Sequence, residues 1–362
     1  MKKKTIVIYL NGLSHPGGME RVVSNLLGHW SRDFEILLVT KDSGESFYAL
    51  PQGIRKVSLS IPMTMNMKSR LRRIFTVFIS LYRSIFRLKK FLKHLSFDYI
   101  YVTSPQNAFE VYLADKRVAK EKMVISEHAS IYAFNKIYMM MKNWVYPRAY
   151  CISVPNSMDT PIYQTWGCNA VFIPHMFTFR TDKQIDNKEK FVLNVGRLTP
   201  DKQQDRLLIM WDKIENRNDW KLKIVGDGED LQKLKAIVHD RNLTDSVELI
   251  PAQKDIQSIY KKASLFAFTS RCEGFGMVLL EAMAFGVPCI SYDCPSGPRD
   301  IIKNGKNGYL IENQNEEQYV SKLQSLLLLS DSDFTKLSQG AFETIDKWDN
   351  EGIINKWKEI FI

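Results

Sequence analysis

The chain has 362 residues, of which 45% are hydrophobic and 25% charged, a composition that supports sizeable cores and excludes intrinsic disorder. At roughly 150 residues per domain, this length predicts two domains. The five cysteines are too scattered for a disulfide framework, and none forms a C-x-x-C pair. The sequence therefore argues against zinc and thioredoxin-type sites and favours a reducing compartment.

Most of the positive charge lies in one segment. The net charge is +10, and residues 46–97 hold eleven Lys or Arg but no Asp or Glu, so the other 310 residues sum to −1. Such a segment suits nucleic acid, an anionic membrane or an acidic ligand. The apolar run at 6–10 is too short for a signal peptide, and the stretch near 74–85 is too short to span a bilayer. We therefore expect a cytosolic protein whose membrane contact is at most peripheral.

The N-terminal half predicts alternating strands and helices. A strand over 5–10 is followed by a glycine-containing loop, an amphipathic helix from Met19 to Trp30 and a strand over 35–40. A long helix is expected over 67–95. Its apolar face is predicted to hold Leu71, Ile74, Phe75, Phe78, Leu81, Tyr82, Ile85, Leu88, Leu92 and Leu95. Further strands are expected over 99–103, 123–126, 151–154 and 170–173, which predicts a parallel sheet.

The C-terminal half begins after a polar stretch at 182–190, where we expect a domain boundary. Strands are predicted over 191–195, 222–225, 247–250, 265–268, 289–292 and 309–311. A helix over 277–285 is ended by Gly286 and Pro288, and the tail from Phe342 to Phe361 has a helical pattern. The whole predicts two successive doubly wound α/β domains, whose ligands bind outside the carboxyl ends of the strands and between facing domains.

Two loops that follow predicted strands carry residues suited to an anion. Gly17-Gly18 follows the first strand, where glycines allow close backbone approach and the next helix N-terminus attracts negative charge; a plain tight turn is the alternative. Gly196-Arg197, with Lys202 five residues after the arginine, suits a diphosphate, and a solvated surface pair is the alternative. The absence of a G-x-G-x-x-G or Walker motif argues against nicotinamide and ATPase functions.

Two acids, Glu273 and Glu281, lie eight residues apart. Glu281 falls in an apolar helix, where a carboxylate is costly to bury without partners, so it is expected to bind hydroxyls or a cation unless it is a partly exposed helix acid. Eight helical residues span about 12 Å, whereas a retaining glycosidase pair needs roughly 5 Å, so binding fits better than hydrolysis. His128 ends a strand, where it can bind a sugar hydroxyl or serve the fold alone. No His or Cys lies at metal spacing, which predicts no bound metal.

In combination, these stretches resemble glycosyltransferase family 4, retaining nucleotide-sugar-dependent enzymes with the GT-B fold. Similarity to bacterial N-acetylgalactosaminyl transferases that extend lipid-linked oligosaccharides is carried by Gly44-Glu45-Ser46-Phe47-Tyr48 and Ile125-Ser126-Glu127-His128. The family resemblance itself rests on Gly17-Gly18-Met19-Glu20-Arg21, Ser126-Glu127-His128, Gly196-Arg197-Leu198 with Lys202, Gly226-Asp227-Gly228, Glu273-Gly274-Phe275-Gly276 through Glu281, Cys294-Pro295-Ser296-Gly297-Pro298, and Asn307-Gly308-Tyr309-Leu310.

The resemblance implies two Rossmann-like domains facing each other across a cleft. Residues 1–180 would bind the acceptor, residues 181–342 the nucleotide sugar, and the helix at 343–362 would pack back on the first domain. The implied activity is a metal-independent, cofactor-free hexosyl transfer with retention. It would move a hexose or N-acetylhexosamine from a UDP-linked donor to a hydroxyl of a polyprenyl-diphosphate-linked glycan, in bacterial capsule or surface polysaccharide assembly.

The resemblance also implies residue roles. Arg197 and Lys202 would hold the donor diphosphate and offset the charge of the leaving group, while Glu273 and His128 would contact the transferred sugar. Glu281 would accept hydrogen bonds from the ribose hydroxyls. The other implied donor contacts are Gly17, Gly18, Gly196, Phe275, Gly276 and Met277.

The chain departs from the family at two places. Ile173-Pro174-His175 stands where many relatives have Asn-Gly, so no donor contact is assigned to His175. Gln203 replaces the usual glycine after Lys202, which changes the phosphate loop.

The basic segment and the activity each leave alternatives. The segment is either the solvated face of a crossover helix, a contact for the acceptor pyrophosphate, or a surface that docks on the anionic inner face of the cell membrane. The docking residues would be Lys68, Arg70, Arg72, Arg73, Arg83, Arg87, Lys89 and Lys90. A nucleotide-sugar epimerase of GT-B fold is the alternative enzyme. A nucleic-acid-binding protein is disfavoured because no RNA or DNA module is present and the acids would be unexplained.

Overall fold

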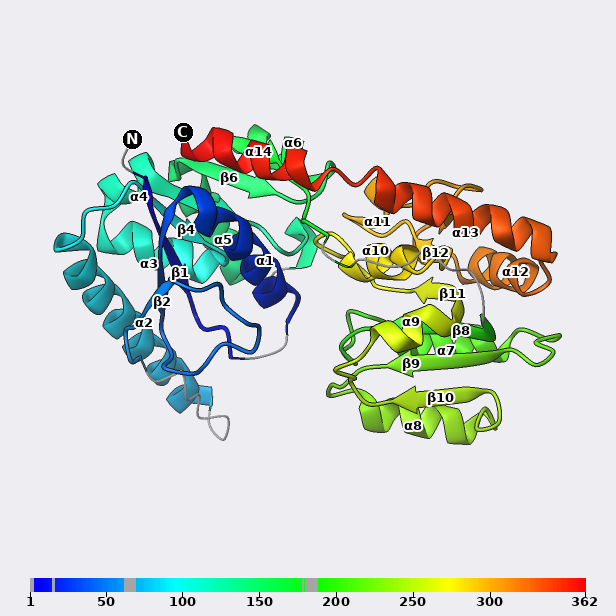
Figure 1. The fold of residues 1–362 in the computed structure, drawn as a ribbon. Helices are drawn as coiled ribbons and strands as arrows, with labels where there is room; N and C mark the ends of the chain where they lie inside the picture. Colours follow the sequence, from blue (N-terminus) through cyan, green and yellow to red (C-terminus); the bar gives the residue numbers. More distant parts are fainter. Residues whose placement is uncertain (1–2, 15–16, 62–69, 134, 178, 180–187) are drawn as a thin grey trace. The chain divides into compact units, whose positions relative to one another are not determined.

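The structure is a computed structural model that describes residues 3–14, 17–61, 70–133, 135–177, 179 and 188–362. The chain divides into two compact units. Unit 1 comprises Met1–Met176 and Glu351–Ile362, and unit 2 comprises Phe177–Asn350. Each unit holds one sheet of parallel strands with helices packed on it (Figure 1), which confirms the predicted α/β fold class.

Unit 1 is built on a seven-stranded sheet of order β3-β2-β1-β4-β5-β6-β7. Its strands are β1 (Thr5–Leu10), β2 (Glu35–Thr40), β3 (Arg55–Ser58), β4 (Tyr99–Val102), β5 (Met123–Ser126), β6 (Cys151–Val154) and β7 (Ala170–Phe172). Its helices are α1 (Gly18–Asp33), α2 (Arg70–Lys93), α3 (Pro105–Ala114), α4 (Lys116–Lys122), α5 (Lys136–Val145), α6 (Asp159–Thr165) and α14 (Asn350–Phe361), with 3-10 turns at Ile131–Ala133 and Tyr146–Arg148.

The central strands of unit 1 are apolar along their whole length because helices cover both faces of the sheet. In β1, every residue from Ile6 to Leu10 is fully buried. On one face, α14 packs its aromatic side chains against α1: the rings of Trp357 and Phe361 each meet the Trp30 ring edge-on, both at 5.1 Å between centroids. The last helix of the chain thereby completes the core of the first unit.

Unit 2 is built on a six-stranded sheet of order β10-β9-β8-β11-β12-β13. Its strands are β8 (Glu189–Val195), β9 (Lys221–Val225), β10 (Val247–Ile250), β11 (Ala263–Phe268), β12 (Cys289–Tyr292) and β13 (Gly308–Ile311). Its helices are α7 (Gln204–Asp212), α8 (Leu231–Asp240), α9 (Gln257–Lys262), α10 (Met277–Ala284), α11 (Pro298–Ile301), α12 (Glu316–Leu327) and α13 (Asp331–Asp346).

Two apolar clusters cover the two faces of the unit 2 sheet. One gathers Trp211 of α7 with Tyr319 of α12, and the other gathers Phe266 of β11 with Leu279 of α10. Neighbouring strands β8 and β11 lie at the centre of this sheet, so the loops that follow them open at the same edge.

The structure differs from the sequence-based expectations at two helices. The helical pattern at 342–361 is divided between the end of α13 and α14, with a break at residues 347–349. In α2, the predicted apolar face is too wide: Leu88 and Leu92 are buried, but Phe78 and Tyr82 are 66% and 71% exposed. Only part of the apolar stripe meets the neighbouring α3 and the sheet, since one helix can bury only the side that faces its neighbours.

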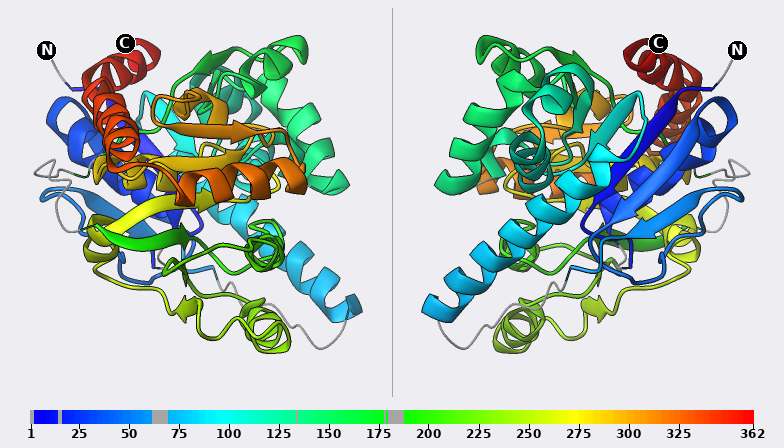
Figure 2. Two further views of the ribbon diagram at one scale, coloured as in Figure 1. Left: turned by 90° about the vertical axis from the view of Figure 1, so that its right-hand side faces the viewer. Right: turned by 90° about the vertical axis from the view of Figure 1, so that its left-hand side faces the viewer.

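Figures 1 and 2 show α2 as the long helix on the outer side of unit 1, with its first turns extending past the strands. Among the described residues, no helix combines the length and the apolar character needed to cross a bilayer.

The packing of α14 generates a stability prediction. Trp357 is 3% exposed and contacts Trp30, Tyr101 and Phe361, so Trp357→Ala should lower the free energy of unfolding by about 3–5 kcal/mol. Lys358→Ala on the same helix removes only a half-exposed ion pair with Asp33 and should cost at most about 1 kcal/mol. Urea unfolding of both variants checks this, and equal effects would contradict the assignment of α14 to the core of unit 1.

Candidate functional site

The loop after β8 carries the two predicted cations of unit 2. Its backbone packs closely on the turn after β9: Gly196 N–H donates to Val225 O at 3.1 Å and Leu198 N–H to Asp227 O at 2.9 Å. A Cβ at Gly226 would lie 1.9 Å from Gly196 O, so this turn requires glycine. The Arg197 side chain is exposed at this edge of the sheet.

Lys202, at the end of the same loop, forms an ion pair with Glu273 from the loop after β11. The distance from Lys202 Nζ to Glu273 Oε1 is 2.5 Å, and a second carboxylate, Asp201, lies 3.5 Å away. Burial by itself lowers the pKa of Lys202, but the two carboxylates outweigh it, so the pKa is raised overall. The side chain is therefore a permanent cation, and it is still 19% exposed.

Gln203, which follows Lys202, stands where the resemblance predicts a glycine. It precedes the first residue of α7 and has a φ of 53°, in the left-handed region that favours glycine. Its side-chain amide exchanges hydrogen bonds with Gln314, at 3.0 and 3.2 Å. These side-chain contacts hold a non-glycine residue in that backbone conformation.

Glu281 is buried in α10, with a 5% exposed side chain. The hydroxyl of Tyr260, from α9, donates to its Oε2 at 3.1 Å. The helix begins after Gly276, whose φ of 93° turns the chain from the Glu273 loop into α10. Tyr260 carries no motif and lies 21 residues upstream, so sequence reasoning missed it.

The Phe275 side chain is buried in the core of unit 2. It is 2% exposed, and its ring packs on Trp348 at 5.6 Å between centroids. The loop after β12 approaches its backbone so closely that a Cβ at Gly297 would lie 2.2 Å from Phe275 O. Gly274 and Gly276 on either side of Phe275 are buried as well, and Met277 is half-buried.

In unit 1, His128 follows β5 and is half-buried, although both of its ring nitrogens are buried. Neither of its ring nitrogens has a hydrogen-bond partner in the described part of the chain. The ring stacks on His175, which follows β7, with 5.0 Å between centroids and 20° between planes. Burial lowers the pKa of His128 to about 4, so the imidazole is neutral at physiological pH. His175, to which the sequence assigned no contact, thus belongs to the surroundings of His128.

Gly17 and Gly18 begin α1 after β1. Gly17 has an extended backbone and Gly17 O accepts from Arg21 N at 3.0 Å. A Cβ at Gly17 would lie 2.0 Å from Glu20 Oε2, whereas no atom of the described residues lies within 4 Å of a Cβ at Gly18. Gly18 is exposed at this helix N-terminus, a position that favours an anion.

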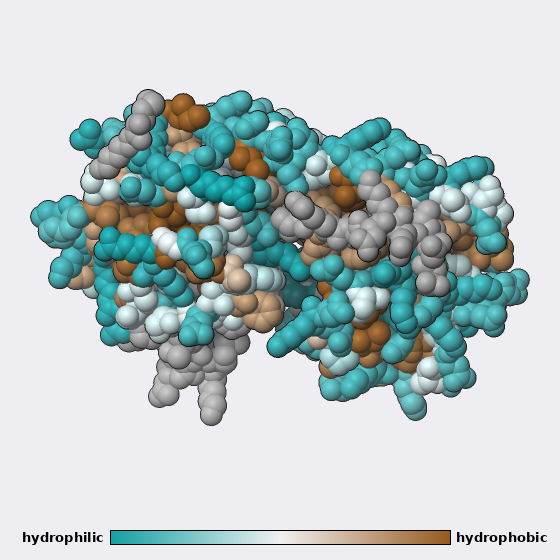
Figure 3. All heavy atoms as spheres, viewed as in Figure 1, coloured by the Kyte–Doolittle hydropathy of each residue, from teal (hydrophilic) through white to brown (hydrophobic). Residues whose placement is uncertain are grey.

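All of the predicted docking residues except Lys68 lie within α2. Lys68 lies outside the described residues, and Arg70, Arg72 and Arg73 are described only as part of the helix. Arg83, Lys89 and Lys90 are exposed, whereas Arg87 also donates to Ser60 O at 2.6 Å. Sequence analysis missed that Phe78, Tyr82 and Phe86 form an exposed aromatic row beside these cations. In Figure 3, apolar side chains gather on unit 1 in the region of α3, which packs against α2.

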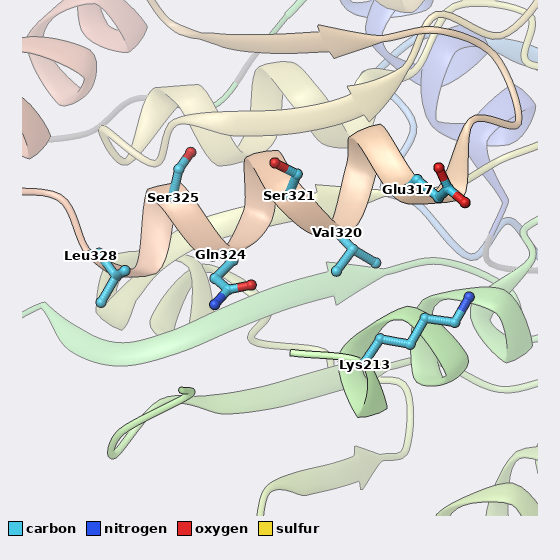
Figure 4. A pocket seen from close by; sticks show the side chains of 7 residues that line it. All are labelled: Lys213, Glu317, Val320, Ser321, Gln324, Ser325 and Leu328. Atoms are coloured by element: carbon cyan, nitrogen blue, oxygen red, sulfur yellow. The ribbon is translucent and has the colours of Figure 1, made fainter. Parts of the chain in front are cut away.

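A surface pocket of about 520 Å³ lies in unit 2, away from all these residues. It is lined by Lys213, Glu317, Val320, Ser321, Gln324, Ser325 and Leu328 (Figure 4). Lys213 reaches toward α12, where it pairs with Glu316 at 3.3 Å. The pocket contains no strand-end residue, and we assign it no role. The described residues contain no cluster of three His, Cys, Asp or Glu that could hold a metal ion.

Unit 2 thus brings Gly196, Arg197, Lys202 and Glu273 to the carboxyl ends of β8 and β11, with Glu281 in the helix that follows. Unit 1 places Gly17, Gly18 and His128 at the carboxyl ends of β1 and β5.

Two family models match the chain: glycosyl transferases group 1 over residues 176–342 and glycosyltransferase family 4 over residues 16–177. The amylovoran biosynthesis glycosyltransferase AmsD of Erwinia amylovora is 29% identical over 98% of this chain and 99% of its own. A Campylobacter jejuni α-1,4-N-acetyl-D-galactosaminyltransferase, named for its GalNAc-α-(1→4)-GalNAc-α-(1→3)-diNAcBac-PP-undecaprenol substrate, is 27% identical over 93% and 91% of the two chains.

Solved structures share the fold. The galactosyltransferase WaaB of the lipopolysaccharide outer core has a TM-score of 0.75 at 22% identity, over 98% of both chains. TarM of S. aureus, in complex with UDP, has a TM-score of 0.79 at 16% identity over 99% of both chains. Anabaena HepE, also with UDP, has a TM-score of 0.74 at 15% identity over 98% of both chains.

The buried ring nitrogens of His128 generate a pH prediction. The folded protein binds a proton at this ring only near pH 4, whereas the unfolded chain binds it near pH 6.5, so unfolding takes up a proton between these values. The free energy of unfolding should fall as pH drops from about 6.5 to about 4. In His128→Gln this fall should be shallower, which urea unfolding at pH 7.0 and 4.5 measures. An identical pH dependence in both proteins would contradict a neutral His128 ring with buried nitrogens.

Proposed function

Because the chain belongs to the group 1 and family 4 glycosyltransferases, we propose that it transfers a hexose or N-acetylhexosamine, with retention, from a UDP-linked donor. The acceptor is a hydroxyl of a polyprenyl-diphosphate-linked glycan in bacterial surface polysaccharide assembly. The name of the Campylobacter relative supports this acceptor class, and the UDP complexes of TarM and HepE support the donor class. The named relatives are transferases, so the epimerase alternative is not favoured.

The observation that carries the proposal is the Lys202–Glu273 pair beside the exposed Arg197. A donor diphosphate carries two negative charges and competes with Glu273 for the Lys202 ammonium. When Lys202 and Arg197 bind the diphosphate, Glu273 loses its partner and accepts hydrogen bonds from hydroxyls of the transferred sugar instead. One ion pair exchange thereby couples diphosphate binding to sugar binding.

The donor nucleoside contacts the other acid. The Glu281 carboxylate, which accepts from the Tyr260 hydroxyl, binds the ribose hydroxyls. The backbone of Phe275, Gly276 and Met277 lies between the two acids in the chain and borders the sugar. The Gly196 backbone approaches the diphosphate, as do Gly17 and Gly18 at the start of α1.

Transfer breaks the bond between the anomeric carbon and the diphosphate oxygen and forms a bond from the acceptor oxygen on the same face. The acceptor proton moves to the departing diphosphate. Arg197 and Lys202 stabilise the charge that develops on this leaving group, which is the role a metal ion would otherwise fill. The neutral ring of His128 contacts the sugar without adding positive charge at a centre that itself becomes positive.

Removing either cation tests the proposal. Arg197→Ala and Lys202→Ala should each lower kcat/KM by about 100-fold or more, because each removes a charge that stabilises the leaving diphosphate. Lys213→Ala, a lysine of the same unit outside the site, should stay near the unsubstituted rate. Nucleotide release is measured with a panel of nucleotide sugars and lipid-linked acceptors, with melting temperatures to verify folding. Near-normal rates in both site variants would refute the assignment.

We further propose that α2 docks unit 1 on the inner face of the cell membrane. Its exposed cations would meet anionic headgroups, each contributing up to roughly 1 kcal/mol, and its aromatic row would enter the headgroup region. Such docking would bring the enzyme to a lipid-linked acceptor.

Vesicle binding tests the docking surface. Replacing Arg83, Lys89 and Lys90 by Ala should abolish most co-sedimentation with vesicles that contain phosphatidylglycerol, and Phe78→Ser/Tyr82→Ser should weaken it further. The matched control replaces three exposed lysines of unit 2, Lys235, Lys254 and Lys261, and should bind normally. Equal, negligible binding of the unsubstituted protein to anionic and neutral vesicles would reject docking.

A further inference from the structure

A buried polar network lies directly before His128 in unit 1. The Glu127 carboxylate, 2% exposed, accepts hydrogen bonds from the hydroxyls of Tyr146 at 2.5 Å and Tyr163 at 2.7 Å. The fully buried Lys142 of α5 donates to the same carboxylate and, at 2.8 Å, to Tyr163 Oη. Burial raises the pKa of both tyrosines, so they remain protonated donors. Three donors from α5, the turn after it and α6 therefore converge on one carboxylate.

A second buried carboxylate holds the other end of the same short segment. Asp159, 1% exposed, accepts from Ile131 N at 3.0 Å. At the first end, Glu127 N also donates to Ser153 O of β6 at 2.9 Å. Residues 127–131, which carry His128, are thus fixed at both ends by acids that contact different elements.

The ring of His128 has no hydrogen bond of its own in the described residues that could orient it. Its position depends on the backbone of the 127–131 segment and on the stacking contact with His175. Anything that fixes the backbone at residue 127 therefore also fixes the imidazole of the next residue.

Stability alone does not explain such a network. Buried ion pairs recover little more than the cost of removing the charges from water, and apolar residues of similar volume often stabilise a protein as well or better. Unit 1 contains a second pair of the same composition, Lys41 and Glu110 with the hydroxyl of Tyr9 at 2.7 Å from Glu110 Oε2. That pair offers a matched comparison because neither Lys41 nor Glu110 is next to a predicted site residue in the chain.

We propose that Glu127 is a positioning residue for sugar transfer: its contacts with Lys142, Tyr146 and Tyr163 hold the segment that presents His128 to the transferred sugar. This inference rests on the proposed function of His128. Glu127 itself touches no substrate and acts through the backbone of the adjoining residue.

The test compares Glu127→Gln with Glu110→Gln, which each neutralise the acid of one buried pair. Glu127→Gln should lower kcat by about tenfold to a hundredfold with little change in the KM of the nucleotide sugar, since a misplaced contact group affects the reaction more than donor binding. Glu110→Gln should keep kcat within about threefold of the unsubstituted protein per folded molecule. The double variant Glu127→Gln/Lys142→Met also removes the buried lysine whose ion pair with Glu127 the first substitution breaks, so it should recover stability but not kcat.

A spectroscopic measurement tests whether Glu127 positions the His128 ring independently of whether the protein transfers a sugar. In protein labelled with ¹³C-histidine, Glu127→Gln should shift the His128 ring signals, identified by their loss in His128→Gln, and leave those of His29, His94 and His239 in place. Equal kcat in the Glu127 and Glu110 variants, recovery of kcat in the double variant, or unshifted His128 signals would overturn the inference. If instead His128→Gln and Arg197→Ala both keep full activity, the proposed function fails, and the His128 shifts still decide whether Glu127 positions the ring.

Discussion

Parallel strand pairing is the constraint on which the rest of this structure depends. Every strand pair in both sheets runs in the same direction, so the carboxyl ends of the strands open at one edge of each sheet. Except between β2 and β3, the chain returns through a helix from each strand to the next strand of the same sheet, and the strand-to-helix loops carry polar residues. The cations after β8, the acid after β11 and the histidine after β5 are all consequences of this arrangement.

Three lysine–glutamate pairs, each with at least one member just after a strand, differ in their exposure to solvent. Lys202 and Glu273 are 19% and 14% exposed, so a dissolved anion can reach the pair and exchange with one partner. Lys142 with Glu127, and Lys41 with Glu110, are at most 3% exposed and are closed to such exchange. The first pair therefore suits ligand binding, whereas the buried pairs can act only on the protein itself. Their burial, rather than their residue types, separates these roles.

The helix α2 combines a structural face and an unpartnered face. Leu88 and Leu92 bury against the unit, while Phe78, Tyr82 and Phe86 stay more than half exposed between cations. A soluble surface rarely keeps aromatic residues in a row at helical spacing, because burying them against a partner would be favourable. The helix belongs to the basic segment at residues 46–97, so exposed aromatic side chains and cations lie on one surface.

The sequence by itself determined the fold class and the family. Apolar runs of strand length alternating with amphipathic helices predict parallel sheets, and the spacing of Gly196, Arg197, Lys202, Glu273 and Glu281 indicates the glycosyltransferase resemblance that the comparisons confirm. Tertiary structure decided what those residues touch. Three contacts join residues that are distant in the chain: the Lys202–Glu273 pair, the Tyr260 contact to Glu281 and the His128–His175 stack. The exposure of Tyr82 likewise depends on which elements pack against α2. Periodicity reports which side of a helix is apolar, but only the packed neighbours determine how much of that side is covered and which polar groups meet.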